Sequence, residues 1–147
     1  MTIKTFRGIL DMGVQQKINL ATLNGKTGYK ITKFQTITEK PGYDQANEIV
    51  CKIYSKQQLN FPAEIDFSEG DLLAAAYYED NVSSHEGVSK LIIFDNKIFN
   101  QNIFVYAEDA EGGSARLNYY IELETIALTD VQSTQLTLKN LRTIASR

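Results

Sequence analysis

The sequence contains one cysteine, Cys51, one histidine, His85, and no tryptophan. A single cysteine excludes an intramolecular disulfide framework and any zinc cluster built from several cysteines. A single histidine excludes a metal site with several histidine ligands and every catalytic scheme that requires two of them. The sequence therefore has few of the side chains on which metal-assisted and nucleophilic catalysis usually depend.

Long hydrophobic runs are also missing from the sequence. The longest apolar run, residues 72–78, is only seven residues long, whereas a membrane-spanning helix needs about 20. Residues 1–20 alternate charged and apolar positions and do not resemble a secretory signal peptide. We therefore expect a soluble protein made in the cytoplasm, and the length of 147 residues fits a single domain.

Residues that favour β-sheets are abundant. Isoleucine, valine, threonine, phenylalanine and tyrosine together make up about a third of the chain, and these side chains fit the pleated, half-buried surface of a sheet. The hydrophobic fraction of 43% argues against disorder. The composition and pattern predict an all-β fold, namely a two-sheet, jelly-roll-like β-sandwich of about eight strands with a short C-terminal helix or arm.

Residues 1–38 are predicted to form an initial segment, followed by two strands joined by a tight turn. Residues 3–10 are interpreted as a first strand or as an N-terminal arm within residues 1–13. The pair Asn24 and Gly25 is the strongest hairpin signal in the chain, because both residues tolerate a positive φ. It lies between a short alternating strand at 17–20 and a longer one at 27–38. A bulge near residues 32–34 would reconcile the apolar positions of the longer strand.

Further strands are predicted from alternating or apolar segments. They lie at residues 48–55, 90–94, 103–107 and 116–128, and a short edge piece is predicted within residues 61–67. Residues 72–78 are ambiguous, since their alanines and leucines favour a helix. Because this run is short and bounded by turn residues, we favour a buried central strand over a helix.

One helix is predicted at the C-terminus. Thr129 and Gln132 have the spacing of a capping box, in which each side chain bonds the backbone of the other residue. An apolar stripe starts at Val131, includes Leu138 and Leu141, and reaches Ala145. Basic side chains in the last turns, among them Lys139 and Arg142, complement the helix dipole.

The net charge of −3 is distributed unevenly along the chain. Residues 1–60 contain nine basic and four acidic residues, residues 61–130 contain three and fourteen, and residues 131–147 contain three and none. Folding could place these segments side by side, so that their charges balance and the electrostatic field of the protein is weak. Alternatively, faces of opposite charge could orient neighbouring subunits.

Candidate catalytic and ligand-binding patterns are weak. Cys51 lies on the same strand face as Ile49 and Ile53, so we expect a buried thiol. Residues 83–86 (SSHE) are interpreted as a solvated loop and not as a catalytic triad, whose members usually come from different segments. Carboxylates at 79–80, 95, 108–109 and 111 could gather into a calcium site, although no calcium-loop motif is present. Phosphate-binding glycine motifs are absent, and the lysines near Tyr29 and Phe34 read as a solvated strand face. We expect neither a cofactor nor a nucleic-acid partner.

Two tyrosine pairs, at 77–78 and 119–120, each place one ring toward the core and one outward. We predict that Tyr78 and Tyr120 are the outward members. Exposed tyrosines are effective contact residues, so these two could belong to a protein interface or to a sugar-binding platform.

Three stretches resemble a known group of proteins. These are 18–20 with 28–31 (INL and GYKI), 93–101 (IFDNKIFNQ), and 118–124 with 138–142 (NYYIELE and LKNLR). They resemble small proteins that are encoded by tailed phages of marine bacteria and are associated with virion structural genes. The resemblance spans most of the chain and implies no catalytic residues.

The resemblance implies a non-enzymatic virion subunit, and we favour a head decoration or cement protein that binds the major capsid protein or other virion subunits. We expect it to form homo-oligomers on the particle, away from any membrane. The alternative is a carbohydrate-binding β-sandwich of a tail fibre or spike. The predicted interface residues are Phe6, Arg7, Tyr78, Tyr120, Leu138, Leu141 and Arg142.

Overall fold

The computed structural model describes residues 2–40, 47–80 and 88–145. These residues form eight strands followed by one helix. The elements are β1 (Ile3–Leu10), β2 (Gln15–Ile18), β3 (Thr27–Thr38), β4 (Asn47–Tyr54), β5 (Leu72–Asp80), β6 (Val88–Phe94), β7 (Ile103–Asp109), β8 (Leu117–Ala127) and α1 (Asp130–Ala145). Within the described ranges, no helix is long and apolar enough to cross a membrane.

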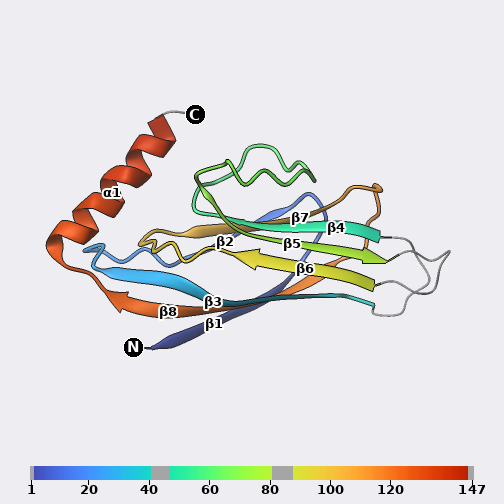
Figure 1. The fold of residues 1–147 in the computed structure, drawn as a ribbon, viewed down its shortest axis with the longest axis horizontal. Coiled ribbons are helices and arrows are strands. Elements are labelled where there is room, and N and C mark those ends of the chain that lie inside the picture. The colour runs from blue at the N-terminus through green and yellow to red at the C-terminus, as the bar shows by residue number, and fades with distance from the viewer. Residues whose placement is uncertain (1, 41–46, 81–87, 146–147) are drawn as a thin grey trace.

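The strands form two antiparallel sheets that stack on each other (Figure 1). The smaller sheet has the order β1-β8-β3, and the larger sheet has the order β2-β7-β4-β5-β6. Helix α1 projects from one end of this sandwich (Figure 1). The predicted two-sheet β-sandwich with a C-terminal helix is therefore confirmed.

The main core lies between the two sheets. On β8 the inner-face residues Leu117, Ile121 and Leu123 are buried, and on β4 the inner-face residues Ile49 and Ile53 are buried as well. Burying each such side chain stabilises the fold by about 1.5–3 kcal/mol. The alternation that the sequence predicted for both strands is confirmed.

The first strand, β1, pairs with β8 along its whole length, from Ile3 opposite Glu124 to Leu10 opposite Leu117. Of the two interpretations of residues 3–10, the structure therefore has the strand and not a free arm. Among the strands that the structure describes, β1 pairs only with β8, so it forms one edge of the smaller sheet.

The predicted bulge in β3 is confirmed. The register of β3 against β8 shifts between Ile31 and Lys33, which leaves Thr32 as the extra residue. The shift places Ile31 and Phe34 in the core although they are three positions apart.

The predicted β-hairpin at Asn24 and Gly25 is wrong. Strand β2 pairs with β7, whereas β3 pairs with β8, so the chain changes sheets between these two strands. Gly25 does adopt a positive φ of 65°, and Asn24 Oδ1 accepts a hydrogen bond from the Lys26 backbone N–H. The local turn chemistry is present, but it connects strands that do not pair.

Strand β5 confirms the predicted strand at residues 72–78. It pairs with β4 on one side and with β6 on the other, so it lies inside the larger sheet. The three small alanines of β5 are buried on both faces of this sheet. Central position in the sheet thus overrides the helix propensity of the run.

The short edge strand predicted within residues 61–67 is wrong. The segment between β4 and β5 forms no strand and instead lies on the outer face of the larger sheet (Figure 1). Its Phe61 ring packs against the Tyr106 ring with centroids 5.0 Å apart, and Tyr106 Oη donates a hydrogen bond to the Pro62 carbonyl (3.0 Å). Side-chain packing therefore holds this segment.

The predicted capping box of α1 is confirmed. The Thr129 backbone N–H donates to Gln132 Oε1 (3.0 Å), and the Gln132 backbone N–H donates to Thr129 Oγ1 (3.2 Å). Asp130 in the first turn forms an ion pair with Lys26 at 2.7 Å. These contacts fix where the helix begins, directly after β8.

Candidate functional site

The outer face of the smaller sheet brings two of the predicted interface residues together. Tyr120 on β8 lies opposite Arg7 on β1 and, on its other side, opposite Gln35 on β3. We call this surface the β1–β8–β3 face. The three residues form a row across the sheet, because directly opposed residues in antiparallel strands point to the same side.

A second row borders the first. Asn118 lies between Ile9 of β1 and Ile37 of β3, and the Ile37 side chain is 59% exposed. The two rows line an open groove of about 470 Å³. The groove therefore combines apolar side chains with an arginine and a tyrosine, a composition typical of the centre of protein interfaces.

Neighbouring charges hold the Tyr120 ring in place. The Lys33 ammonium group lies 5.8 Å from the centroid of this ring, a cation–π distance. Tyr120 Oη donates a hydrogen bond to Glu122 Oε1 at 2.8 Å. An aromatic side chain that is already ordered loses little conformational entropy when a partner binds.

The prediction that Tyr78 faces outward is wrong. Tyr78 is only 7% exposed and belongs to the core between the sheets. It lies opposite Ile49, whose side chain also points inward, so Tyr77 is the outward member of this pair. Tyr78 and Tyr120 therefore do not form a shared sugar-binding platform.

The prediction for the other tyrosine pair is confirmed. Tyr119 is buried, and its hydroxyl group donates to Gln16 Oε1 (3.0 Å), while Tyr120 lies on the outer face. Phe6, in contrast, is partly buried and packs against the main core, so it is a packing residue more than a contact residue.

Helix α1 turns part of its apolar stripe away from the sheets. Val131 is 66% exposed and Leu138 is 50% exposed, whereas Ser133 is buried. The helix thus packs through a largely polar face, and its predicted interface residue Leu138 is accessible. Leu141 and Arg142 lie in the last turns of α1, but their side chains are outside the described residues.

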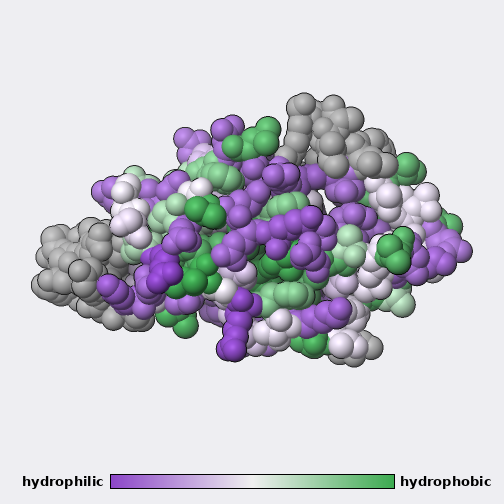
Figure 2. Space-filling view, turned by 180° about the vertical axis from the view of Figure 1, so that it is seen from behind, coloured by the Kyte–Doolittle hydropathy of each residue, from purple (hydrophilic) through white to green (hydrophobic). Residues whose placement is uncertain are grey.

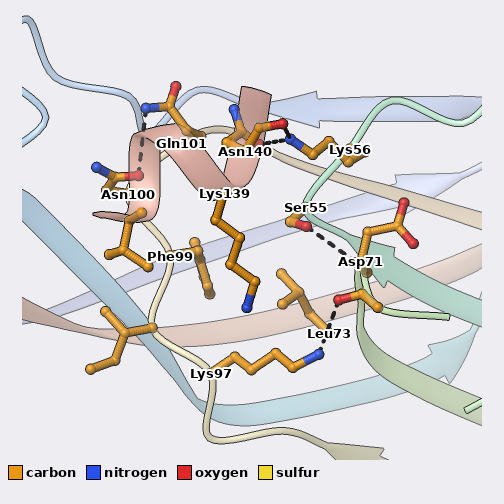
Figure 3. Close-up of a pocket in the computed structure, with 13 residues that line it drawn as sticks. Ser55, Lys56, Asp71, Leu73, Lys97, Phe99, Asn100, Gln101, Lys139 and Asn140 are labelled. Carbon is orange, nitrogen blue, oxygen red and sulfur yellow. Dashed lines mark hydrogen bonds between the residues drawn. The ribbon is translucent and has the colours of Figure 1, made fainter. Parts of the chain in front are cut away.

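A cleft lies where α1 meets the body of the protein (Figure 3). Lys56, just after β4, donates hydrogen bonds to both the backbone carbonyl and the side-chain oxygen of Asn140 on the helix. Asn100 Nδ2 donates to the Gly25 carbonyl (2.9 Å) and to Thr137 Oγ1 (3.4 Å). Polar contacts from two segments, those of Lys56 and Asn100, therefore hold the helix over this cleft.

Two adjoining hollows make up the cleft. The first has a volume of about 60 Å³ and is lined by Lys97, Lys139 and Phe99, among others. The second has a volume of about 370 Å³ and includes Asn102 and Phe104 in its lining. We call them the lysine hollow and the amide hollow. Sequence reasoning missed this cleft, although the run of amide residues at 100–102 was a visible signal.

A buried lysine lies on the outer face of the larger sheet, beneath the segment between β4 and β5. The Lys52 ammonium group is 5.6 Å from the Tyr106 ring centroid, and it donates to Tyr54 Oη (3.4 Å). Tyr54 in turn donates to Glu69 Oε1 (3.1 Å). Burial lowers the pKa of Lys52, while the Glu69 carboxylate acts in the opposite direction. This enclosed network fastens the covering segment to the sheet.

Strand β4 begins at the end of the sandwich away from α1 (Figure 1). Several carboxylates lie near Glu48 at this end. Burial, followed by the charges of Glu111, Glu79 and Asp109, raises the pKa of Glu48. Asp95, which the calcium hypothesis included, instead lies 3.8 Å from Lys97. In the described ranges, no group of three or more histidine, cysteine or carboxylate side chains could hold a metal ion.

Of the remaining candidate nucleophiles, the structure describes Cys51. Cys51 is buried in the core, as predicted, and burial raises the pKa of its thiol well above the usual range. Residues 83–86, with His85, lie outside the described residues.

On the side of the molecule seen in Figure 2, hydrophilic and hydrophobic side chains are interspersed.

No protein-family model and no curated protein matches this chain.

Proposed function

We propose that the protein is a non-enzymatic structural subunit of a phage particle, most specifically a head decoration or cement protein that binds the major capsid protein. The observation that carries this proposal is the β1–β8–β3 face. There Arg7 and Tyr120 lie side by side in one row across the sheet, and Ile37 lies in the adjacent row on the same face. The sequence resemblance to virion proteins supplies the class of partner.

The chemistry of this face suits recognition of a protein surface. Tyrosine and arginine are among the residue types most enriched at binding hot spots. Around them lie charged side chains that would form a polar rim, such as Lys30, which is 3.9 Å from Glu124. An apolar and aromatic centre with a polar rim is the usual anatomy of a protein interface.

On a particle that binds many copies, each individual contact can be weak. A capsid presents the same docking surface many times, and subunits that touch both the capsid and each other bind more tightly than one contact allows. The exposed stripe of α1, with Val131 and Leu138, is available for contacts between neighbouring subunits. We therefore assign the sheet face to the capsid and the helix stripe to homotypic contacts.

The proposal is tested first on purified particles. Mass spectrometry should find this chain at a stoichiometry comparable to that of the major capsid protein. Complete absence from particles would overturn the proposal.

The docking face is tested by adding purified protein to particles that lack it and measuring co-sedimentation. We expect Tyr120→Ala to reduce bound protein at least tenfold. The matched control is Lys17→Ala, which changes an exposed side chain on β2 of the other sheet. If both variants bind like the unmodified protein, the β1–β8–β3 face is not the docking surface.

A further inference from the structure

The lysine hollow collects positive charge at the end of the sandwich that carries α1. Lys56, Lys97 and Lys139 line it, and Asp71 is the acidic residue among its lining residues. Figure 3 shows that Lys139 extends from the helix into the hollow, while Lys97 approaches from the opposite side. Lys97 also lies 3.8 Å from the Asp95 carboxylate just outside the hollow. The three ammonium groups still outnumber the two carboxylates, and this excess of positive charge favours the binding of an anion.

The surrounding structure orients these charges. Lys97 donates a hydrogen bond to the Gly70 carbonyl at 3.0 Å, and Lys56 is held by Asn140. The Asp71 carboxylate accepts a hydrogen bond from Gln58 Nε2 at 3.2 Å. Charges held in position before binding cost less to order when a ligand arrives.

The amide hollow has a different chemistry. It shares Lys56 and Gln101 with the lysine hollow and adds Asn102 and the aromatic ring of Phe104. Asn102 Oδ1 accepts hydrogen bonds from two backbone N–H groups, those of Leu20 (2.7 Å) and Ala21 (2.9 Å). These bonds fix the side chain, whose Nδ2 group is then the donor available to a ligand.

We propose that this cleft binds a small organic anion with a hydroxyl-rich body, namely a sugar phosphate or a sugar acid. The charged group would occupy the lysine hollow, beside Lys97 and Lys139. The sugar ring would lie in the amide hollow, where amides bond its hydroxyl groups and Phe104 contacts its apolar side. The combined hollows, of about 60 and 370 Å³, fall in the usual size range of small-molecule sites.

The test is isothermal titration calorimetry of the 147-residue chain at low ionic strength. The probes are glucose 6-phosphate and glucuronate. These two arms distinguish a phosphate from a carboxylate as the preferred charged group. Glucose and inorganic phosphate serve as partial ligands. We expect at least one of the two charged sugars to bind at least tenfold more tightly than either partial ligand.

Variants locate the site. Lys139→Ala should weaken binding at least fivefold, and Lys139→Arg, which keeps the charge, should stay within twofold of the unmodified protein. Lys139 is exposed on the helix, so neither change should alter the melting temperature. Lys17→Ala, which removes another exposed lysine, on β2, is the matched control and should bind normally.

Several results would overturn the inference. Absence of binding by both charged sugars would do so, as would equal weakening by Lys17→Ala and Lys139→Ala, which indicates non-specific attraction. Glucose that binds as tightly as the charged sugars would remove the role of the lysines. Inorganic phosphate that binds as tightly would remove the role of the amide hollow.

Discussion

Arg7 and Tyr120 lie directly opposite each other in the register between β1 and β8, on the outer face of the smaller sheet. The two residues are far apart in the sequence, and the pairing of the first strand with the last one places them side by side. Their position on the same face gives the protein an arginine–tyrosine pair where a partner can contact both. We expect this pair to dominate the affinity of the face.

The first prediction concerns Arg7. Arg7→Glu should reduce attachment to particles at least tenfold, because it reverses the charge at the centre of the proposed interface. The side chain is exposed, so the free energy of unfolding should change by less than about 0.5 kcal/mol. Co-sedimentation measures the attachment and urea unfolding measures the stability. Loss of attachment together with a large loss of stability would point to a folding defect instead.

The second prediction concerns Cys51. Its thiol is buried and its pKa is raised by that burial, so the native protein should not react with a thiol reagent at pH 8. Reaction should begin only in the urea range where the fold is lost. Absorbance after addition of Ellman's reagent measures both states. Rapid labelling in native buffer would show that the core around β4 opens locally.

The third prediction concerns Glu48. Because its pKa is raised in the folded protein, the unfolded chain loses the proton first, and stability falls as pH rises from 4.5 through the raised pKa. Glu48→Gln removes this effect, so the variant should melt at a higher temperature than the unmodified protein at pH 7. The difference should be smallest at pH 3.5, where the unmodified side chain is protonated in both states. An equal difference at both pH values would contradict the raised pKa of Glu48.

The fourth prediction concerns Gly28, where β3 passes beneath the residue that leads into α1. A Cβ atom at this position would lie 2.9 Å from Leu128 Cδ2 and 3.0 Å from Ile98 Cγ2. Gly28→Ala should therefore destabilise the fold by about 1–3 kcal/mol through overpacking. Gly70→Ala is the matched control, because nothing lies within 4 Å of its Cβ position. Urea unfolding should separate the two variants, and equal stability would show that Leu128 and Ile98 move aside freely.

Local features of the fold could be predicted from the sequence. The alternation along β8, the extra residue Thr32 in β3 and the capping box of Thr129 and Gln132 are all present in the structure. Each depends on residues that are close together in the chain. Short-range sterics and hydrogen bonding specify them without reference to the rest of the molecule.

The candidate sites could be predicted only in part. Arg7 and Tyr120 were recognisable as contact residues, but their pairing required knowledge that β1 lies beside β8. Beyond the run of amide residues at 100–102, the cleft could not be predicted, because Lys56, Lys97 and Lys139 come from three distant segments. Their proximity depends on how the helix docks against the two sheets.

The sequence by itself determined the β-rich class, the bulge, the helix start and the burial of Cys51, because these follow from local spacing and side-chain type. Only the tertiary structure decided that β2 and β3 belong to different sheets and that Tyr78 faces the core. The strand that contains Tyr78 begins with five apolar residues, so its pattern does not distinguish its two faces. The pairing of β5 with β4 and β6 determines which side of the sheet Tyr78 faces. The orientation of a side chain in a sheet is set by strand register and by what covers each face.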